Sequence, residues 1–206
     1  MAHFFVYIAC FVFALNSATA DQDKIKITIG TTAGCSNTAK FINEQLVHTY
    51  KQYKDNLEIE FVPWGRTVRD VTGALSCQYG KKDCWANRLQ RCVLNLLKDT
   101  TAQLNYMQCE FSRPFPSYVQ NNYRCARTAG VYKPALQCMN RGFAELDRAA
   151  EEKARLPMQL INYVPSISIN DIHDSGVHNA AIAGLSEFIK KELNAQILPK
   201  PTTIAY

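Results

Sequence analysis

The hydrophobic pattern near the start of the chain predicts a strand, a helix and a second strand. Isoleucines alternate with polar residues over Lys24–Gly30, which is the two-residue period of a β-strand. Over Ser36–Tyr53, apolar residues recur every three or four positions and so share one face of a helix. Leu57–Phe61 alternates again, and Pro63-Trp64-Gly65 closes it. Because the connections are short, this order predicts a parallel βαβ unit.

The next segment departs from this alternation. Residues 66–140 contain most of the cysteines, a short helical pattern at Asn87–Asp99 and proline-containing loops. A charged, alanine-rich helix is predicted over Gly142–Leu156, and it should end at Pro157 because proline cannot continue the hydrogen bonding of a helix. We therefore expect a helical insertion, about residues 66–156, inside one α/β domain.

The β pattern returns after the insertion. Leu160–Val164 is predicted as a strand and is followed by Pro165. Residues 167–169 alternate in the same way, and Asn170-Asp171 predicts a turn. A last amphipathic helix is expected over about Asn179–Leu193. A chain of 206 residues suits one domain of this kind with a substantial core.

The N-terminus has the features of a secretory signal. Residues 1–20 are mostly apolar and end in Ala18-Thr19-Ala20, the small-x-small pattern of a signal-peptidase site. The segment lacks the usual Lys or Arg ahead of its apolar run, but it is also short for a membrane span. We predict cleavage after Ala20 rather than a retained anchor, a mature single domain at residues 21–206, no membrane span, and secretion.

Cleavage after residue 20 would remove Cys10 and leave seven of the eight cysteines. In an oxidising compartment such a set predicts disulfides, and an odd number leaves at least one thiol free or bonded to another molecule. The spacing is not that of a zinc site, so we predict no metal and no other cofactor. Cys35 stands alone upstream. The other six, whose fifteen pairings the sequence does not distinguish, are Cys77, Cys84, Cys92, Cys109, Cys125 and Cys138.

The charge of the chain is modestly positive and scattered. Its formal net charge is +5, from 23 Lys and Arg residues against 18 Asp and Glu residues. Basic residues do not alternate with aromatic ones as they do in a nucleic-acid-binding surface. We therefore predict no nucleic-acid partner, and at most a weak attraction to anionic surfaces.

Cys35 directly follows the first predicted strand and begins the first predicted helix. Free backbone N–H groups and the helix dipole stabilise a thiolate at such a position and make the sulfur nucleophilic. A dithiol oxidoreductase also needs a cysteine three residues later, which attacks the mixed disulfide and releases the reduced substrate. In Cys35-Ser36-Asn37-Thr38 that position is Thr38, whose hydroxyl can hydrogen-bond a thiolate but cannot resolve a disulfide.

A longer motif, CQYGKKDCWANRLQRC at residues 77–92, resembles the signature C-Q-H-G-x2-E-C-x2-N-x4-C of the gamma-interferon-inducible lysosomal thiol reductase (GILT) family. Tyr79 replaces the histidine of that signature, and Asp83 replaces its glutamate. Two shorter segments, Val62-Pro63-Trp64-Gly65 and Tyr163-Val164-Pro165, resemble the V-P-Y-G and Y-V-P motifs of the family. The signature positions that match at the right spacing are Cys77, Gln78, Gly80, Cys84, Asn87 and Cys92.

The resemblance covers nearly the whole mature chain and is strongest toward secreted insect members, mosquito salivary GILT-like proteins in particular. It implies a thioredoxin-like fold with a disulfide-rich helical insertion, and an ancestral activity of reducing protein disulfides at acid pH. It also implies that Pro165 follows a cis peptide bond and faces Cys35. Tyr79 would matter for activity if the histidine of the signature had a redox role, but the spacing of the motif favours a place in the scaffold. The chain has no Asn-x-Ser/Thr sequon for the N-glycan that routes the family to lysosomes, which favours secretion.

Two interpretations of function follow from the residues and the resemblance. In the first, the chain is a secreted GILT-like protein without dithiol reductase activity, in which Cys35 is an inherited cysteine. This protein would act by binding an extracellular protein or a cell surface. In the second, it is a thiol–disulfide oxidoreductase that works through Cys35 alone, and an external thiol such as glutathione releases the product. A free, exposed Cys35 would also allow a disulfide-linked dimer.

Overall fold

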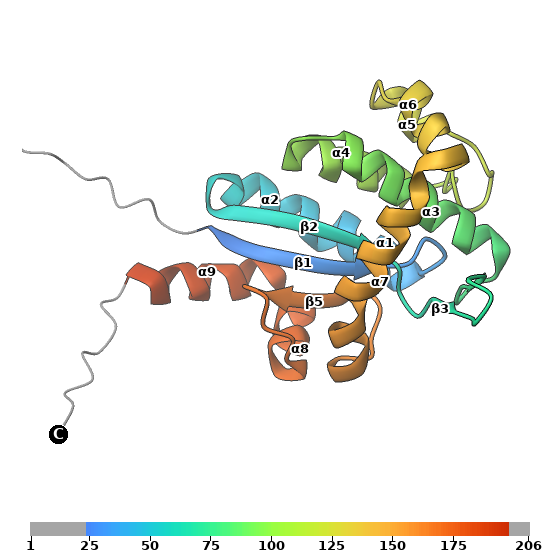
Figure 1. Cartoon of the computed structure of the whole chain (residues 1–206). Helices are drawn as coiled ribbons and strands as arrows, with labels where there is room; N and C mark the ends of the chain where they lie inside the picture. Colours follow the sequence, from blue (N-terminus) through green and yellow to red (C-terminus); the bar gives the residue numbers. More distant parts are fainter. Residues whose placement is uncertain (1–23, 198–206) are drawn as a thin grey trace, which may run out of the picture.

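A three-stranded sheet forms the centre of the computed structural model, which describes residues 24–197 (Figure 1). The predicted signal peptide and the chain beyond residue 197 lie outside these residues. The strand order is β2-β1-β5. β1 (Ile25–Thr31) and β2 (Leu57–Pro63) are parallel, whereas β5 (Ser166–Ile169) is antiparallel to β1. The predicted βαβ unit is therefore confirmed.

An almost continuous helix connects β1 to β2, as the sequence predicts. It consists of α1 (Ser36–Phe41), a π-helical turn (Ile42–Leu46) and α2 (Val47–Tyr53). A short 3-10 turn (Lys54–Asn56) then leads into β2. The isoleucines of β1 are fully buried and belong to one apolar cluster with the buried face of this helix. The main core thus lies on one face of the sheet.

The segment between β2 and β5 is the predicted insertion, and it is mainly helical. It begins with a hairpin of β3 (Val68–Arg69) and β4 (Leu75–Ser76). Figure 1 shows most of its helices gathered toward the end of the sheet where β1 and β2 finish. These helical segments are α3 (Lys81–Leu96), α4 (Thr100–Glu110), α5 (Arg124–Thr128), α6 (Tyr132–Gln137), a π-helical turn (Cys138–Gly142) and α7 (Phe143–Leu160).

Three disulfides hold the insertion together. Cys77–Cys84 closes the segment that leads into α3, and Cys109–Cys125 links α4 to α5. Cys92–Cys138 joins α3 to the turn that precedes α7. The structure thereby selects one of the fifteen pairings. Within residues 24–197, Cys35 is the only cysteine without a disulfide partner.

Helix α7 continues through Pro157, so the prediction that it ends there is wrong. Ala150, Ala154 and Pro157 are buried at helical spacing on one face. Packing of this face outweighs the hydrogen bond that the proline removes. The predicted strand at Leu160–Val164 is consequently wrong as well, because Leu160 is still helical and Asn162 adopts a positive φ of 52°.

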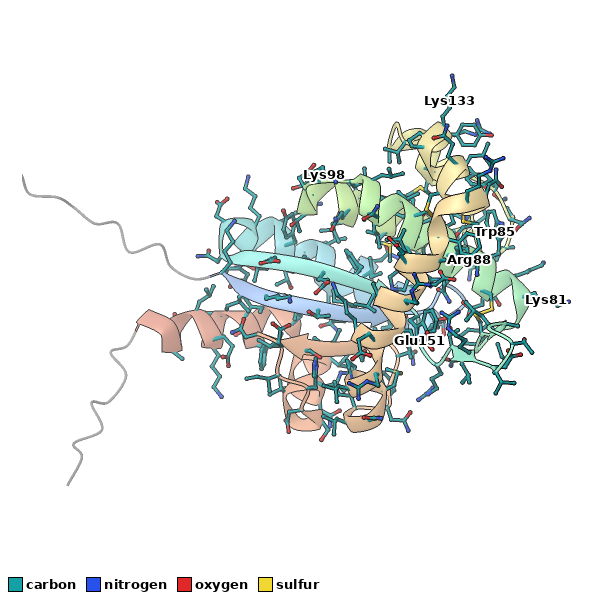
Figure 2. All side chains as sticks on the ribbon, in the orientation of Figure 1. Lys81, Trp85, Arg88, Lys98, Lys133 and Glu151 are labelled. Carbon is teal, nitrogen blue, oxygen red and sulfur yellow. A yellow bond between two sulfur atoms is a disulfide. The ribbon has the colours of Figure 1, made fainter. Side chains whose placement is uncertain are left out.

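The C-terminal helix is divided in two. α8 (Ser175–Ala183) and α9 (Leu185–Ile197) are separated at Gly184, whereas a single helix was predicted. Glycine is a poor helix former and commonly follows a helix end. None of the helices within residues 24–197 combines the length and apolar character needed to cross a membrane. Lys81, Lys98 and Lys133 lie at separate points on the periphery of the insertion, which fits the scattered charge (Figure 2).

A buried ion pair joins the insertion to the end of β2. Arg91 of α3 donates from Nη2 to Asp147 Oδ1 of α7 at 2.6 Å, and both side chains are almost fully buried. Arg91 also donates to the Pro63 carbonyl oxygen at the end of β2. Arg88 donates to the second carboxylate oxygen of Asp147 at 2.9 Å. One carboxylate therefore fixes α3 and α7 to each other, and Arg91 ties both to the sheet.

We expect Asp147→Ala to lower the free energy of unfolding by about 3–5 kcal/mol, because it leaves the Arg91 charge buried without its partner. Chemical denaturation with the disulfides intact would measure the change. Glu152→Ala is the matched control, since Glu152 lies on the same helix and pairs with Arg155 at the surface. Its effect should stay below about 1 kcal/mol. Equal losses in the two variants would contradict the role of the buried pair.

Candidate functional site

Cys35 lies at the junction of β1 and α1, where the hydrophobic pattern places it. Its backbone N–H donates to the Thr32 carbonyl at 3.1 Å and so closes a tight turn over residues 32–35. Cys35 is the N-cap residue of α1, and its carbonyl accepts from Ala39 N at 3.1 Å. Cys35 therefore stands at the N-terminus of α1, the position that the sequence predicts for it.

The segment before β5 covers the sulfur from the other side. Cys35 Sγ donates to the Val164 carbonyl oxygen at 3.4 Å, and the Val164–Pro165 peptide bond is cis. Pro165 thus lies next to the cysteine. Only 6% of the Cys35 surface is exposed. The exposure that a disulfide-linked dimer through Cys35 would need is not present, because the turn and the Val164 segment enclose the cysteine.

Thr38 occupies the position at which a dithiol site has its second cysteine. It is the third residue of α1, three positions after Cys35. Thr38 is fully buried, and its hydroxyl has no hydrogen-bond partner among the described residues. The position of the second thiol therefore holds a buried hydroxyl group instead of a thiol.

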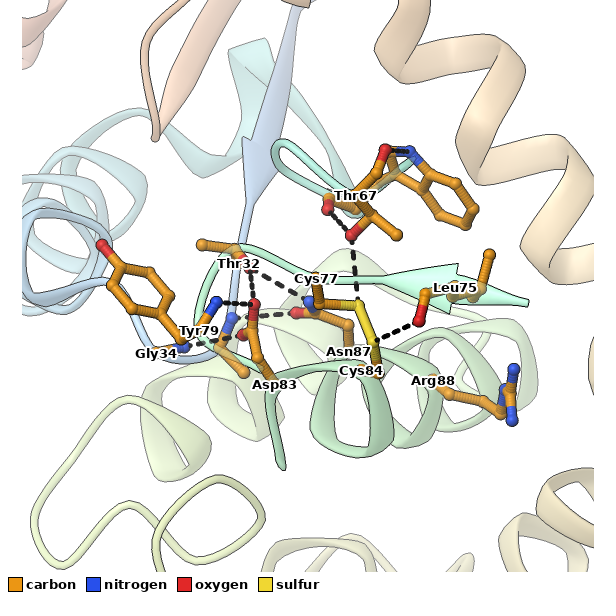
Figure 3. Close-up of a disulfide and its surroundings, with 12 residues drawn as sticks. Thr32, Gly34, Thr67, Leu75, Cys77, Tyr79, Asp83, Cys84, Asn87 and Arg88 are labelled. Atoms are coloured by element: carbon orange, nitrogen blue, oxygen red, sulfur yellow. Dashed lines mark hydrogen bonds between the residues drawn. A yellow bond between two sulfur atoms is a disulfide. The ribbon is translucent and has the colours of Figure 1, made fainter. Parts of the chain in front are cut away.

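Two side chains near the start of helix α3 form hydrogen bonds to the residues that precede Cys35 (Figure 3). Asp83 is fully buried and accepts hydrogen bonds from the Thr32 hydroxyl at 2.8 Å and from Gly34 N at 3.0 Å. Asn87, one turn later, accepts from Ala33 N at 2.8 Å and donates to Thr32 Oγ1 at 3.0 Å. These two side chains bind every residue of the turn ahead of the cysteine.

Sequence reasoning missed this role of Asp83 and Asn87. The predicted helix began only at Asn87, whereas α3 begins at Lys81 and so includes both residues. The available signal was their four-residue spacing, which places two polar side chains on one helix face. What the sequence did not show is that this face meets the turn at residues 32–34, about fifty positions earlier.

Tyr79 lies against the same turn. A side chain at position 34 would come within 2.8 Å of the Tyr79 Cβ and ring atoms, so this approach requires Gly34. Burial raises the pKa of the Tyr79 hydroxyl, and the neighbouring Cys35 raises it further. The Tyr79 side chain itself remains 40% exposed. Tyr79, interpreted from the sequence as scaffold, is thus also a neighbour of the cysteine.

The two shorter motifs also meet this turn. In Val62-Pro63-Trp64-Gly65, Trp64 N donates to the Thr31 carbonyl at 3.0 Å, and Gly65 (φ 56°) packs directly on Thr32. In Tyr163-Val164-Pro165, the Tyr163 hydroxyl accepts from Asn37 Nδ2 at 2.8 Å. The structure therefore brings together three motifs that are separate in the sequence, and it does so around Cys35.

A cavity of about 620 Å³ lies away from this cysteine, along the edge of β2 and beside α7. Four of its charged side chains form one cluster of ion pairs around Lys26 and Glu60. Lys26 Nζ lies 3.3 Å from Glu60 Oε2 and 2.9 Å from Asp171 Oδ1, and Lys153 also binds Glu60. These two lysines lower the pKa of Glu60 against the opposing effect of burial. Because the cavity contains neither Cys35 nor the turn ahead of it, we assign the chemistry to the Cys35 region instead.

A parallel βαβ unit with a helix-capping cysteine opposite a cis-proline places the chain among the thioredoxin-like proteins. A thioredoxin-like oxidoreductase from Silicibacter pomeroyi DSS-3 has a similar structure, with a TM-score of 0.55. The match covers 84% of this chain and 88% of that chain at 9% sequence identity. The α/β thioredoxin-like fold with a helical insertion is therefore confirmed.

The family within this class follows from the sequence comparisons. The model of the family "Gamma interferon inducible lysosomal thiol reductase (GILT)" matches residues 26–129, about half of the chain, and the protein belongs to this family. A GILT-like protein of Anopheles gambiae is 23% identical over 85% of this chain and 79% of its own length. GILT-like protein 1 of Drosophila melanogaster is 26% identical over 98% of this chain and 86% of its own. The predicted resemblance to insect members is thus confirmed.

We expect Asp83→Ala to loosen the turn ahead of Cys35. The substitution leaves Gly34 N and the Thr32 hydroxyl without their acceptor, which should lower the free energy of unfolding by about 1–3 kcal/mol. Amide hydrogen exchange at Gly34 should accelerate. Asp70→Ala is the control, because Asp70 accepts two backbone N–H groups in the exposed β3–β4 turn. If both variants leave exchange at Gly34 unchanged, Asp83 does not hold the turn.

We expect Tyr79→Ala to raise the rate at which Cys35 reacts with a small aromatic disulfide by at least about fivefold, because thiol reactivity depends on access. Tyr79→Phe keeps the ring and loses only the hydroxyl, so its rate should stay within about twofold of the wild type. Absorbance of the released thiol gives both rates. A fast Tyr79→Phe variant would assign the effect to the hydroxyl and would contradict shielding by the ring.

Proposed function

We propose that this GILT-family protein is secreted and has no dithiol reductase activity, and that it acts by binding an extracellular protein or a cell surface. The observation that carries the proposal is Thr38, which fills the position of the second thiol beside Cys35 and is fully buried there. In this proposal the protein keeps the thioredoxin-like fold and lacks only the step that completes a reduction cycle, in which a second thiol releases the reduced substrate.

The chemistry of release supports the absence of turnover. A mixed disulfide between Cys35 and a substrate is resolved when a second thiolate attacks the Cys35 sulfur. In the part of the chain that the structure describes, the six other cysteines are all in disulfides. A threonine hydroxyl cannot take over this step, because it does not form a stable bond to sulfur by exchange. A substrate captured at Cys35 would therefore remain attached until an external thiol arrived.

The surface around Cys35 supports a binding role. Tyr79 and Tyr163 are each 40% exposed, and both belong to segments that contact the turn or first helix at the cysteine. Val119, in the loop whose Tyr118 packs edge-on against Tyr79, is 51% exposed. Tyrosines are enriched in protein interfaces because they offer a large rigid contact area with a polar end. The Cys109–Cys125 disulfide closes this loop and so limits the entropy lost on binding.

Secretion is supported by the chemistry of the cysteines. Three disulfides in one domain are typical of an oxidising compartment. Residues 1–20 are apolar and end in a small-x-small pattern, so they would serve as the signal peptide for export to that compartment. The sequence has no N-glycan sequon and so lacks the signal for lysosomal routing.

A second candidate function is monothiol exchange through Cys35 with an external thiol. It is favoured by one observation: Asp83 and Asn87 still hold the turn that places the sulfur at the N-terminus of α1. A substrate disulfide would then be opened by Cys35, and glutathione would release the product.

One assay separates the two functions. Reduction of a protein disulfide is measured at pH 4.5 and at pH 7, with and without glutathione, for the wild type, Cys35→Ser and Thr38→Cys. We expect the wild type to be no faster than Cys35→Ser, and Thr38→Cys to gain turnover. Asn37→Cys is the matched control, because the exposed position 37 points away from the position-38 side chain and should gain nothing.

Two results would contradict the proposal. Turnover of the wild type without glutathione that depends on Cys35 would show a complete reductase. Cys35-dependent turnover only with glutathione would establish the monothiol function in its place.

A further inference from the structure

We infer that the outer edge of β2 is a docking site for an extended segment of a partner protein, which adds to the sheet as a further strand. The site is the cavity of about 620 Å³ along β2, called the β2 groove below. It is separate from the surface on which the proposed function rests, because it contains neither Cys35 nor the turn ahead of it.

The β2 groove follows the backbone of the strand rather than one of its faces. Six consecutive residues of β2, positions 58–63, line it. Successive side chains of a strand point to opposite faces of the sheet, so a cavity that touches all six runs along the edge of the strand. β2 is an outer strand of the described sheet, with β1 on its inner side (Figure 1).

The pairing of β2 with β1 shows which backbone groups point into the groove. Trp64 N donates to the Thr31 carbonyl, so in this parallel register the even-numbered residues of β2 bond to β1. The odd-numbered residues therefore point outward. Among them, Ile59 and Phe61 have no hydrogen-bond partner for their backbone N–H and C=O groups within the part of the chain that the structure describes.

These unpaired groups match the backbone of another strand. Ile59 and Phe61 are only 3% and 8% exposed, and backbone groups at such burial are nearly always paired. N–H and C=O groups that recur at every second residue are the pattern that an added strand satisfies. Pro63, the next outward residue, has no N–H to leave unpaired, and Arg91 already binds its carbonyl.

The walls of the groove decide what kind of chain can enter. α3 and α4 pack with Ile59 and Phe61 in the main core, whereas α7 packs with Val62 in a second cluster. Helices therefore stand on both faces of the edge. A folded second copy of the protein would meet these helices before its own strand reached β2, whereas a single extended segment fits between them. About five or six residues would span β2 at about 3.3 Å per residue.

The charges of the groove favour a segment that carries both signs. Glu58 of β2 and Lys98 of the α3–α4 wall line the groove and are exposed, and neither forms an ion pair within residues 24–197. A basic side chain of the partner would complement the first, and an acidic side chain the second. The other charged lining residues already have partners: Lys26, Glu60, Arg91, Glu152, Lys153 and Asp171.

The test begins with a phage-displayed library of eight-residue peptides, selected on the folded protein with its three disulfides. Each selected peptide is synthesised, its amides are methylated one at a time, and binding is measured by calorimetry. Methylation at alternate positions should weaken binding at least about tenfold, because it removes a hydrogen bond to β2. At the intervening positions the change should stay below about twofold. Equal effects at all positions, or no binding peptide, would overturn the inference.

Substitutions in the protein locate the bound peptide. Ala149→Trp fills the groove from α7 and should weaken binding at least about tenfold, whereas Ala144→Trp, at an exposed position of the same helix outside the groove, should change it less than about twofold. Lys98→Glu should weaken binding about fivefold, and Lys133→Glu, outside the groove, should not. Cys35→Ser should bind like the wild type. A loss in Cys35→Ser, with none in Ala149→Trp, would place the peptide at the cysteine and overturn the inference.

Amide hydrogen exchange provides a control within β2 itself. In the free protein, Ile59 and Phe61 should exchange at least about tenfold faster than Glu60 and Val62, whose N–H groups face β1. Bound peptide should slow the first pair and leave the second pair unchanged. Slow exchange at Ile59 and Phe61 in the free protein would show that these groups are already paired, and the site would not exist.

Discussion

The Asp83 carboxylate holds the rest of the site in place. It is fully buried, and a buried carboxylate is tolerated only when hydrogen-bond donors surround it. Thr32 and Gly34 supply two of these donors, and Tyr79 N supplies a third at 3.3 Å. The turn ahead of Cys35 and the start of α3 therefore fix each other, because neither can move without leaving the carboxylate unpaired. The Cys77–Cys84 disulfide, which spans Tyr79 and Asp83, reinforces the same unit.

The same helix face explains why the insertion and the sheet form one structure. Asp83, Asn87 and Arg91 are spaced four residues apart, so they follow one side of α3. The first two bind the turn after β1, and Arg91 binds the end of β2 and Asp147 of α7. All three contacts lie near the carboxyl ends of β1 and β2. The four-residue spacing of these side chains within the family signature is thus the spacing expected of a helix that packs one face against the ends of two parallel strands.

This arrangement also shows what a sequence alone could and could not predict. The βαβ unit and the place of Cys35 depend on local periodicity, and both were predicted. The helix through Pro157 was not, because burial of its apolar face outweighs local propensity. The contacts of Asp83 and Asn87 were not predicted either, since they join residues 51 and 54 positions apart. Tyr79 could be identified as a departure from the family signature, but only its packing on Gly34 places it beside the cysteine.

Thr38 raises the question of why a hydroxyl is buried next to the cysteine. An unpaired buried hydroxyl costs about 1–3 kcal/mol, and valine has nearly the same shape without that cost. A role in packing alone would therefore favour valine at position 38. Thr38 therefore keeps a polar group at the position of the second thiol at a cost in stability, and packing does not explain that choice.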